Sequence, residues 1–308
     1  MIDVCVIGFG YWGPNLCRNF VNAPGYNLKS ICDNNKINLQ KAKKNYPSTS
    51  IYLNFNEAIN KNKYDLVVLA TPTSTHFKIA SLVLKKKINI LVEKPLCLNV
   101  KDHIKLNKIA KKNNVKIFVD FPFIFSGSVQ YIKNIIKKNI YGNLKSIESY
   151  REQAPIRNDT NVLWDLSIHD ISIINFLLSP NHNKIVSVLK YNKTKNYNKV
   201  LINIKNKNID ILIKNNWNSP TKIRLIKFIF DNAVVYYDEN ENLYKIKIFK
   251  KYMDKFNQHT LTIPNIDLSE PLFNLAKHIQ KSLNKRNKLS DDNFNLSITN
   301  FMTKLDNF

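Results

Sequence analysis

The residue types best suited to chemistry in this chain are a lysine at 94, an aspartate at 165 and a histidine at 169. An imidazole titrates near neutrality, so His169 can take the proton of an alcohol while a hydride leaves the carbon. Asp165 precedes His169 by four residues, and such positions share one face of a helix. Its carboxylate can therefore orient the imidazole or bind a sugar hydroxyl. The ammonium of Lys94 can hold the reacting oxygen and stabilise negative charge on it.

Each of the three residues also has an interpretation without chemistry. Lys94 is one of 42 lysines, and most lysines of any protein are exposed to solvent. His169 could be a hydrogen-bonded histidine within a helix, and Asp165 a carboxylate on a helix face. The catalytic interpretation of Lys94 rests on its place in Glu93-Lys94-Pro95, directly after an expected buried strand. That is the carboxyl edge at which doubly wound sheets bind ligands.

A cluster of glycines near the start of the chain indicates a binding site for a dinucleotide. Gly8-Phe9-Gly10-Tyr11-Trp12-Gly13 matches the pattern G-x-G-x-x-G, and it lies between an expected strand and an expected helix. The three glycines would allow a tight turn, approach of the pyrophosphate to the backbone, and close packing of helix on strand. The whole chain has six glycines, so three within six positions are hard to attribute to chance.

Asp33 indicates which dinucleotide is bound. It lies 20 residues beyond Gly13, at the end of the second expected strand. An acidic side chain at this place accepts hydrogen bonds from the ribose hydroxyls of the adenosine, and it would repel a 2′-phosphate. We therefore expect NAD as the cofactor, with NADP disfavoured.

Arginines are rare here, with five against 42 lysines, and two of them fall just before the Asp165–His169 pair. A guanidinium binds a carboxylate or phosphate through two parallel hydrogen bonds, which an ammonium cannot do. Arg151 and Arg157 could therefore hold a pyrophosphate or carboxylate of the substrate. The alternative is that both are ordinary surface arginines.

The first part of the chain alternates strand and helix patterns. This rhythm predicts an α/β fold with a doubly wound parallel sheet, the Rossmann arrangement, over residues 1–122. Short apolar runs indicate strands at 4–9, 28–32, 65–70, 89–92 and 116–121, and helices are expected at 14–22, 37–45, 56–60, 74–87 and 100–113.

The rhythm changes after residue 122, where longer strands are joined by short polar turns. We expect residues 123–308 to form a second, α+β domain that binds substrate and supports oligomerisation, with a mostly antiparallel open sheet. Its expected strands are 145–152, 184–192, 199–206, 209–216, 222–231, 233–238 and 243–250, and its helices 128–139, 163–178, 271–283 and 292–308.

Composition narrows the class of protein. The net charge of +24 comes from lysines that are spread along the chain. Lysine shares AT-rich codons with other residues that are frequent here, so a compositional bias of the gene explains the charge. We therefore expect no specific nucleic-acid surface. No stretch approaches the roughly 20 apolar residues of a membrane span, and no leader pattern opens the chain, so we expect a cytoplasmic protein. The four cysteines form no C-x-x-C pair, which favours reduced structural thiols and no metal site.

Four segments together resemble the Gfo/Idh/MocA family of NAD(P)-dependent oxidoreductases, typified by glucose–fructose oxidoreductase and inositol dehydrogenase. They are Gly8–Leu16, similar to members of the sugar and surface-polysaccharide branch; Ala70-Thr71-Pro72 with His76; Glu93-Lys94-Pro95; and Trp164–Asp170, similar to the family's D-x-x-x-H motif. Weaker similarity reaches Glu270-Pro271-Leu272. Ser167 departs from the glycine that many members have there, although the spacing of the motif is kept.

The resemblance implies roles for individual residues. It implies catalysis and substrate binding by Lys94, Asp165 and His169. Arg151 and Arg157 are expected substrate contacts because of the rarity described above. The implied cofactor contacts are Gly8, Gly10, Tyr11, Trp12, Gly13, Asp33, Thr71, Pro72, His76, Glu93 and Lys94. His76 could instead be a polar residue of the following helix, and Trp12 a core residue. We also predict that the Lys94–Pro95 peptide bond is cis.

The function expected from these features is hydride transfer between NAD and a ring hydroxyl of a sugar, with a nucleotide sugar oxidised at its 3-position as one candidate. Inositols and free sugars remain alternatives. A second alternative is a non-catalytic NAD-binding regulator of the same fold. We expect a homo-oligomer, a dimer or tetramer paired through the open sheet.

Overall fold

A computed structural model describes residues 1–191, 197–251, 259–284 and 292–308. The chain divides into two compact units. The first comprises Met1–Pro122 and Glu270–Thr303, and the second comprises Phe123–Ser269 and Lys304–Phe308. Sequence analysis placed all of 123–308 in the second domain, whereas most of the two C-terminal helices packs with the first unit. The functional roles assigned to the two domains stay predictions.

The first unit contains a six-stranded, all-parallel sheet in the order β3-β2-β1-β4-β5-β6. This arrangement confirms the predicted doubly wound sheet. The central strands are apolar on both faces because helices cover each side. The strands are β1 Ile2–Ile7, β2 Tyr26–Cys32, β3 Ser50–Tyr52, β4 Leu66–Leu69, β5 Asn89–Glu93 and β6 Ile117–Asp120.

Seven helices belong largely to the described part of the first unit, five of them between the strands. They are α1 Gly13–Asn22, α2 Lys36–Asn45, α3 Phe55–Lys61, α4 Thr73–Lys85, α5 Val100–Asn113, α8 Pro271–Asn284 and α9 Asp292–Asn307, whose last residues count with the second unit. Helix α8 packs beside α1, and the hydroxyl of Tyr26 donates to the carbonyl of Ala276 at 2.7 Å. The C-terminal segment therefore completes the core of the first unit.

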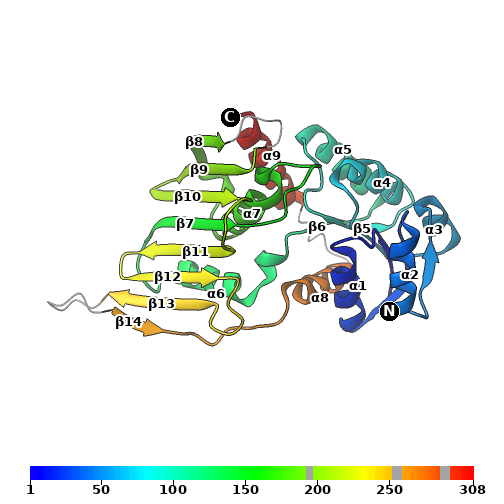
Figure 1. The fold of residues 1–308 in the computed structure, drawn as a ribbon, viewed down its shortest axis with the longest axis horizontal. Coiled ribbons are helices and arrows are strands. Elements are labelled where there is room, and N and C mark those ends of the chain that lie inside the picture. Colours follow the sequence, from blue (N-terminus) through cyan, green and yellow to red (C-terminus); the bar gives the residue numbers. More distant parts are fainter. Residues whose placement is uncertain (192–196, 252–258, 285–291) are drawn as a thin grey trace. The chain divides into compact units, whose positions relative to one another are not determined.

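The second unit is built on an eight-stranded sheet in the order β14-β13-β12-β11-β7-β10-β9-β8 (Figure 1). Its pairs are antiparallel except for β7 with β10, which are parallel. Buried and partly exposed residues alternate along β9 to β13, so one face of the sheet is covered and the other is open. The strands are β7 Leu144–Glu152, β8 Asn183–Tyr191, β9 Lys199–Asn206, β10 Ile209–Asn216, β11 Ile223–Phe230, β12 Ala233–Asp238, β13 Ile246–Lys251 and β14 His259–Thr262.

Sequence analysis missed β3 and β14, which have three and four residues and are too short for a periodic signal. The expected end of β8 at Asn192 lies outside the described residues.

The α-helices of the second unit lie near their predicted positions, but residues 163–178 differ in detail and the two 3₁₀ turns were not predicted. The helical segments are the 3₁₀ turn η1 Pro122–Phe125, which begins at the last residue of the first unit, α6 Gly127–Lys137, the π-helical turn η2 Leu163–Ser167, α7 Ile168–Leu177 and the 3₁₀ turn η3 Pro180–His182. Residues 163–178 were expected to form one regular helix. The backbone N–H of Ile168 instead reaches back to the carbonyl of Leu163, which widens the first turn. Such π turns are frequent at functional sites.

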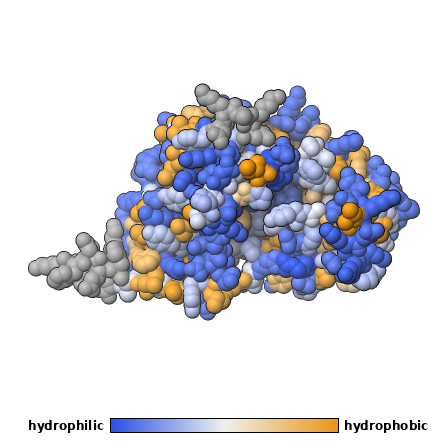
Figure 2. All heavy atoms as spheres, viewed as in Figure 1, coloured by the Kyte–Doolittle hydropathy of each residue, from blue (hydrophilic) through white to orange (hydrophobic). Residues whose placement is uncertain are grey.

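Hydrophilic side chains cover most of the face shown in Figure 2, and hydrophobic ones are scattered among them. Among the described residues, no helix has the length and apolar character needed to cross a bilayer.

Candidate active site

The glycine loop connects β1 to α1, and its geometry explains each glycine separately. Gly8 has a φ of +98°, and a Cβ there would lie 2.3 Å from the carbonyl oxygen of Ala70. A Cβ on Gly13 would lie 2.1 Å from the carbonyl oxygen of Gly8. A Cβ on Gly10 would meet no atom within 4 Å. Packing thus requires the first and third glycines, and the second leaves space in which a pyrophosphate could approach the backbone.

Helix α1 adds to this cradle. It begins at Gly13 with no side-chain cap at Trp12 and no acidic residue in its first turn. The first N–H groups of a helix lack partners within the helix, and the helix dipole makes this end positive. The loop and the start of α1 therefore fit a dinucleotide phosphate.

Asp33 follows β2 and is fixed by two backbone N–H groups. Phe9 donates to its Oδ2 at 2.6 Å, and Asn35 donates to its Oδ1 at 2.7 Å. The carboxylate is 8% exposed. Each carboxylate oxygen can accept more than one hydrogen bond, so this anchored group retains capacity for the hydroxyls of a ribose.

His76, in the first turns of α4, joins two loops at the carboxyl edge of the sheet. Its Nδ1 lies 2.8 Å from the carbonyl oxygen of Pro95, and its Nε2 lies 2.8 Å from that of Thr71. The ring is almost fully buried. His76 thus has one backbone partner in the loop of Thr71 and Pro72 and another in the loop of Lys94 and Pro95. Both loops were predicted to contact the cofactor. The Lys94–Pro95 peptide bond is cis, as predicted.

Glu93 is the last residue of β5, and Lys94 follows it at the same edge. Asp120, the last residue of β6, is in register with Glu93 and accepts a hydrogen bond from Trp12 Nε1 at 3.1 Å. Trp12 is therefore tied to the end of β6 through its indole. Tyr11, in contrast, is 89% exposed, although its ring stacks against Trp12.

Asp165 lies in the π-helical turn η2 of the second unit. Its Oδ2 accepts a hydrogen bond from Trp217 Nε1 at 2.9 Å, and its Oδ1 lies 3.4 Å from Nη1 of Arg157. Trp217, directly after β10, is 2% exposed, so its indole is a fixed donor. One oxygen of Asp165 is thus held by the fold, while the other faces a partly exposed guanidinium.

His169 lies in the first turn of α7 and is partly exposed. Its ring contacts the ring of Phe123 edge to face, with centroids 5.0 Å apart. The guanidinium of Arg151 lies 4.9 Å from the same phenyl ring. Phe123 therefore packs against both the imidazole and a buried cation.

Arg151 is enclosed by carboxylates. Its Nε donates to Asp170 at 3.0 Å, and its two terminal nitrogens bind the carboxylate of Glu239. Burial alone would lower the pKa of Arg151, but the charges of Glu239 and Asp170 outweigh burial and raise it. The arginine is 3% exposed, so its observed partners are part of the protein interior.

Asp170, the residue after His169, organises a buried polar network. It accepts hydrogen bonds from Ser149 at 2.9 Å and from Asn215 at 2.8 Å, besides the one from Arg151. The hydroxyl of Ser167 is hydrogen-bonded to Oδ1 of Asn215. A glycine at position 167 could not form this hydrogen bond, because it has no side chain. The bond gives a local structural reason for a serine at this position.

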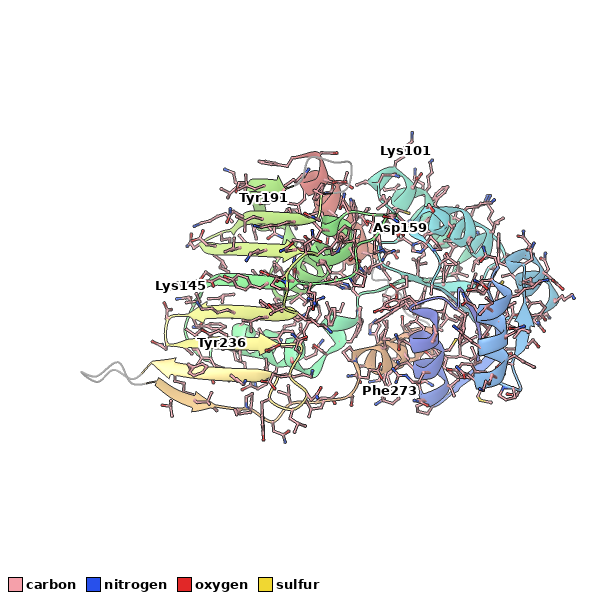
Figure 3. The ribbon with its side chains drawn as sticks, viewed as in Figure 1. Lys101, Lys145, Asp159, Tyr191, Tyr236 and Phe273 are labelled. Carbon is pink, nitrogen blue, oxygen red and sulfur yellow. The ribbon has the colours of Figure 1, made fainter. Side chains whose placement is uncertain are left out.

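Arg157 is the more exposed of the two candidate arginines. It forms a double hydrogen bond with Asp159, at 3.0 and 2.8 Å, in the segment between β7 and η2 (Figure 3). Its third nitrogen faces Asp165. Arg157 is 39% exposed and thus accessible to a ligand, unlike Arg151.

All four cysteines are free and buried. Burial raises the pKa of the Cys97 thiol, the cysteine nearest in sequence to Lys94, to about 12. Within the described part of the chain, no three His, Cys, Asp or Glu side chains come together as a metal site.

A sequence profile of the Gfo/Idh/MocA oxidoreductase family, described as having an NAD-binding Rossmann fold, matches residues 2–121. Over these residues the chain is similar to that family. The match covers the sheet, the glycine loop, Asp33 and the Glu93-Lys94-Pro95 turn described above. It ends before the residues of the second unit, so it does not include Asp165 or His169.

Relatives and solved structures extend the likeness unequally. Myo-inositol 2-dehydrogenase of Thermotoga maritima is 25% identical over 179 residues, which are 56% of this chain and 54% of that protein. The chain matches about half, or less, of such curated relatives.

The whole fold of this chain is found in solved structures at low identity. KijD10, a 3-ketoreductase from Actinomadura kijaniata in complex with NADP and TDP-benzene, has a TM-score of 0.86 at 11% identity, with 98% of this chain and 95% of that chain covered. A levoglucosan dehydrogenase in complex with NADH and levoglucosan has a TM-score of 0.83 at 14% identity, with 99% and 95% covered. At these identities the likeness establishes the fold.

The structural roles of several residues around the candidate site were not predicted from the sequence. These residues are Asp120, Asp170, Asn215, Trp217 and Glu239. Their hydrogen-bond partners lie far away in the sequence, and no short motif indicates such pairs. The chain has three tryptophans, and this scarcity was the one signal that could have drawn attention to them. Trp12 donates to Asp120, and Trp217 donates to Asp165.

Proposed function

We propose that this protein is an NAD-dependent oxidoreductase that transfers a hydride between the nicotinamide and a ring hydroxyl of a sugar. The observation that carries the proposal is the glycine loop: Gly8 and Gly13 are required by packing, while Gly10 leaves open space. An anchored acid at Asp33 and an uncapped helix start complete a dinucleotide site. When bound, NAD supplies the hydride acceptor.

We assign the chemical steps on the sugar to three side chains. The ammonium of Lys94 holds the reacting oxygen and stabilises the negative charge that develops on it. His169 Nε2 or Nδ1 takes the hydroxyl proton, and Asp165 orients the imidazole or the sugar through its carboxylate. The fixed donor from Trp217 supports this role, because it leaves the other oxygen of Asp165 directed toward Arg157.

We propose NAD rather than NADP because of the charge at Asp33. The carboxylate of Asp33 is held in place by two backbone N–H groups, and its negative charge would repel a 2′-phosphate. Solved structures of the same fold bind both cofactors: the levoglucosan dehydrogenase is in complex with NADH, and KijD10 with NADP. The proposed preference for NAD over NADP therefore rests on Asp33 of this chain.

The substrate we propose is a sugar, with a nucleotide sugar oxidised at its 3-position as the first candidate. KijD10 is a 3-ketoreductase in complex with a TDP derivative, and the levoglucosan dehydrogenase binds a sugar. Arg157 can bind a phosphate because it is exposed and presents a planar donor. Arg151 was also expected to bind substrate. Its three donor nitrogens are occupied by Asp170 and Glu239, so the proposal now relies on Arg157.

The experiment that tests the proposal is a turnover assay with matched variants. The purified protein would be analysed for bound nucleotide and then screened with nucleotide sugars, free sugars and inositols for NADH formation. Lys94→Ala and His169→Ala should each lower kcat by at least about 10²-fold. Exposed counterparts, Lys101→Ala on α5 (Figure 3) and His182→Ala, should turn over as the wild type does. Full activity in both Lys94→Ala and His169→Ala would refute the assignment.

The alternative of a non-catalytic NAD-binding regulator predicts a different result. Such a protein would bind NAD but reduce none of it with any sugar offered.

We further propose that the protein acts in the cytoplasm as a homo-oligomer, assembled through the open face of the eight-stranded sheet.

A further inference from the structure

Two carboxyl groups lie side by side at the carboxyl edge of the first unit's sheet. Glu93 ends β5 and Asp120 ends β6, and the two residues are register partners on neighbouring parallel strands. Neighbouring strands are about 4.8 Å apart, and register partners project to the same face of the sheet. The two acids are therefore neighbours by construction of the fold.

The interior around these acids provides few hydrogen-bond donors. Asp120 is 1% exposed, and Trp12 Nε1 donates to its Oδ2 at 3.1 Å. Its other oxygen, Oδ1, and Oε1 of Glu93 are both buried, and neither receives a donor from the described part of the chain. Ionised carboxyl groups only accept hydrogen bonds. Two carboxylates would thus leave two buried acceptors facing like charge.

A single proton removes both difficulties. Burial raises the pKa of Glu93 well above its ordinary value, and the charge of Asp120 raises it further. Burial also raises the pKa of Asp120, but hydrogen bonds from Glu93 and Trp12 oppose that effect. A proton on Glu93 would let its hydroxyl donate to the carboxylate of Asp120. Like-charged carboxyls that share a site commonly behave in this way.

Lys94 is the charged group whose field acts on this pair. Its positive charge lowers the pKa of Glu93 and that of Asp120, and its backbone N–H donates to the Glu93 carboxyl. The attraction is mutual, so a pair with one negative charge also stabilises the ammonium in place. Trp12 connects the same pair to the glycine loop.

We propose that Glu93 and Asp120 share one proton, and that the single negative charge left on the pair makes Asp120 a positioning residue for Lys94. The shared proton is independent of the function proposed above. The positioning role rests on that function, because it presupposes that Lys94 acts on the substrate.

The first experiment tests the proton and needs neither cofactor nor substrate. Infrared spectra of the cofactor-free protein at pH 7, recorded in H₂O and D₂O, should contain a carbonyl band of a protonated carboxylic acid. Asp120→Asn should abolish that band, because the amide donates to Glu93 and lets it ionise, and Glu93→Gln should abolish it by removing the acid. Absence of the band from the wild type, or its persistence in both variants, would overturn the shared proton.

The second experiment tests positioning in the turnover assay. Asp120→Leu removes the negative charge and the hydrogen bonds together, and we expect kcat to fall at least tenfold with an altered pH profile and little change in KM. Asp120→Asn should recover most of this loss, since it leaves one negative charge on Glu93. Equal losses in both variants, in step with their unfolding midpoints, would mean that Asp120 is structural only. If Lys94→Ala were itself fully active, the positioning role would fail while the infrared result stood.

Discussion

The carboxylate of Asp33 accepts a hydrogen bond from the backbone nitrogen of Phe9, 2.6 Å away across the glycine loop. The acid that would select the ribose also fixes the loop that would bind the pyrophosphate. A change at Asp33 can therefore act on cofactor choice and on loop geometry, and a conservative change is needed to separate them.

Asp33→Asn should shift the cofactor preference toward NADP. The amide keeps an oxygen for a backbone N–H but loses the charge that repels a 2′-phosphate. We expect the ratio of the NADP and NAD dissociation constants to fall by at least about tenfold, measured by calorimetric or fluorescence titration. Asp210→Asn, on an exposed aspartate of the second unit, is the control. An unchanged ratio would show that Asp33 does not set the preference.

Trp217→Phe should lower turnover more than Trp164→Phe does, although both changes should lower stability by similar amounts. It removes the indole donor to Asp165 and keeps an aromatic ring in the core, so we expect kcat to fall about tenfold through misorientation of the carboxylate. Trp164→Phe is a matched control, because it removes another buried indole donor, to Asp306 at 2.8 Å. Both changes should cost about 1–3 kcal/mol of unfolding free energy. Equal effects of the two on kcat would contradict the role of Asp165.

His103 should make the protein less stable in acid. It is buried in α5 with its Nδ1 2.8 Å from the Thr299 hydroxyl, and burial lowers its pKa to about 4. The unfolded chain therefore binds this proton more readily than the folded chain, so stability is present above about pH 6.5 and is lost as pH falls toward 4.

The measurement is chemical denaturation across that pH range. The wild type should lose up to about 3 kcal/mol more than His103→Gln, which cannot take up the proton. His182→Gln, on an exposed histidine, should follow the wild type. Parallel curves for wild type and His103→Gln would show that this residue does not cause acid destabilisation.

The open sheet face should carry the oligomer contact. Tyr236 on β12 (Figure 3) and Phe249 on β13 lie on this face, both partly exposed, with ring centroids 5.6 Å apart. Tyr236→Glu with Phe249→Glu should reduce the mass measured by light scattering to that of one chain, 35.9 kDa. Leu243→Glu with Tyr244→Glu, on exposed residues before β13, should keep the wild-type mass. A monomeric wild type would refute this assembly.

Sequence alone predicted the elements that rest on local patterns. Apolar runs led to the parallel sheet, which the structure confirms. The glycine spacing and Asp33 indicated a cofactor site, and short motifs indicated Lys94 and His169 as candidates, which stay predictions. The partners that fix these residues come from distant parts of the chain, as with Trp217 and Asp165. No local pattern encodes such a pair, because packing brings it together. Arg151 illustrates the limit: its rarity was informative, but its carboxylate partners were visible only in the fold.

The return of Glu270–Thr303 to the first unit determines the order in which that unit can fold. Arg18 on α1 pairs with Glu270 through two hydrogen bonds of 2.7 Å, although about 250 residues separate them. A ribosome must therefore release residues 1–303 before the first unit is complete. A fragment cut after Pro122 would expose the apolar side of α1 that α8 covers, so we expect it to aggregate.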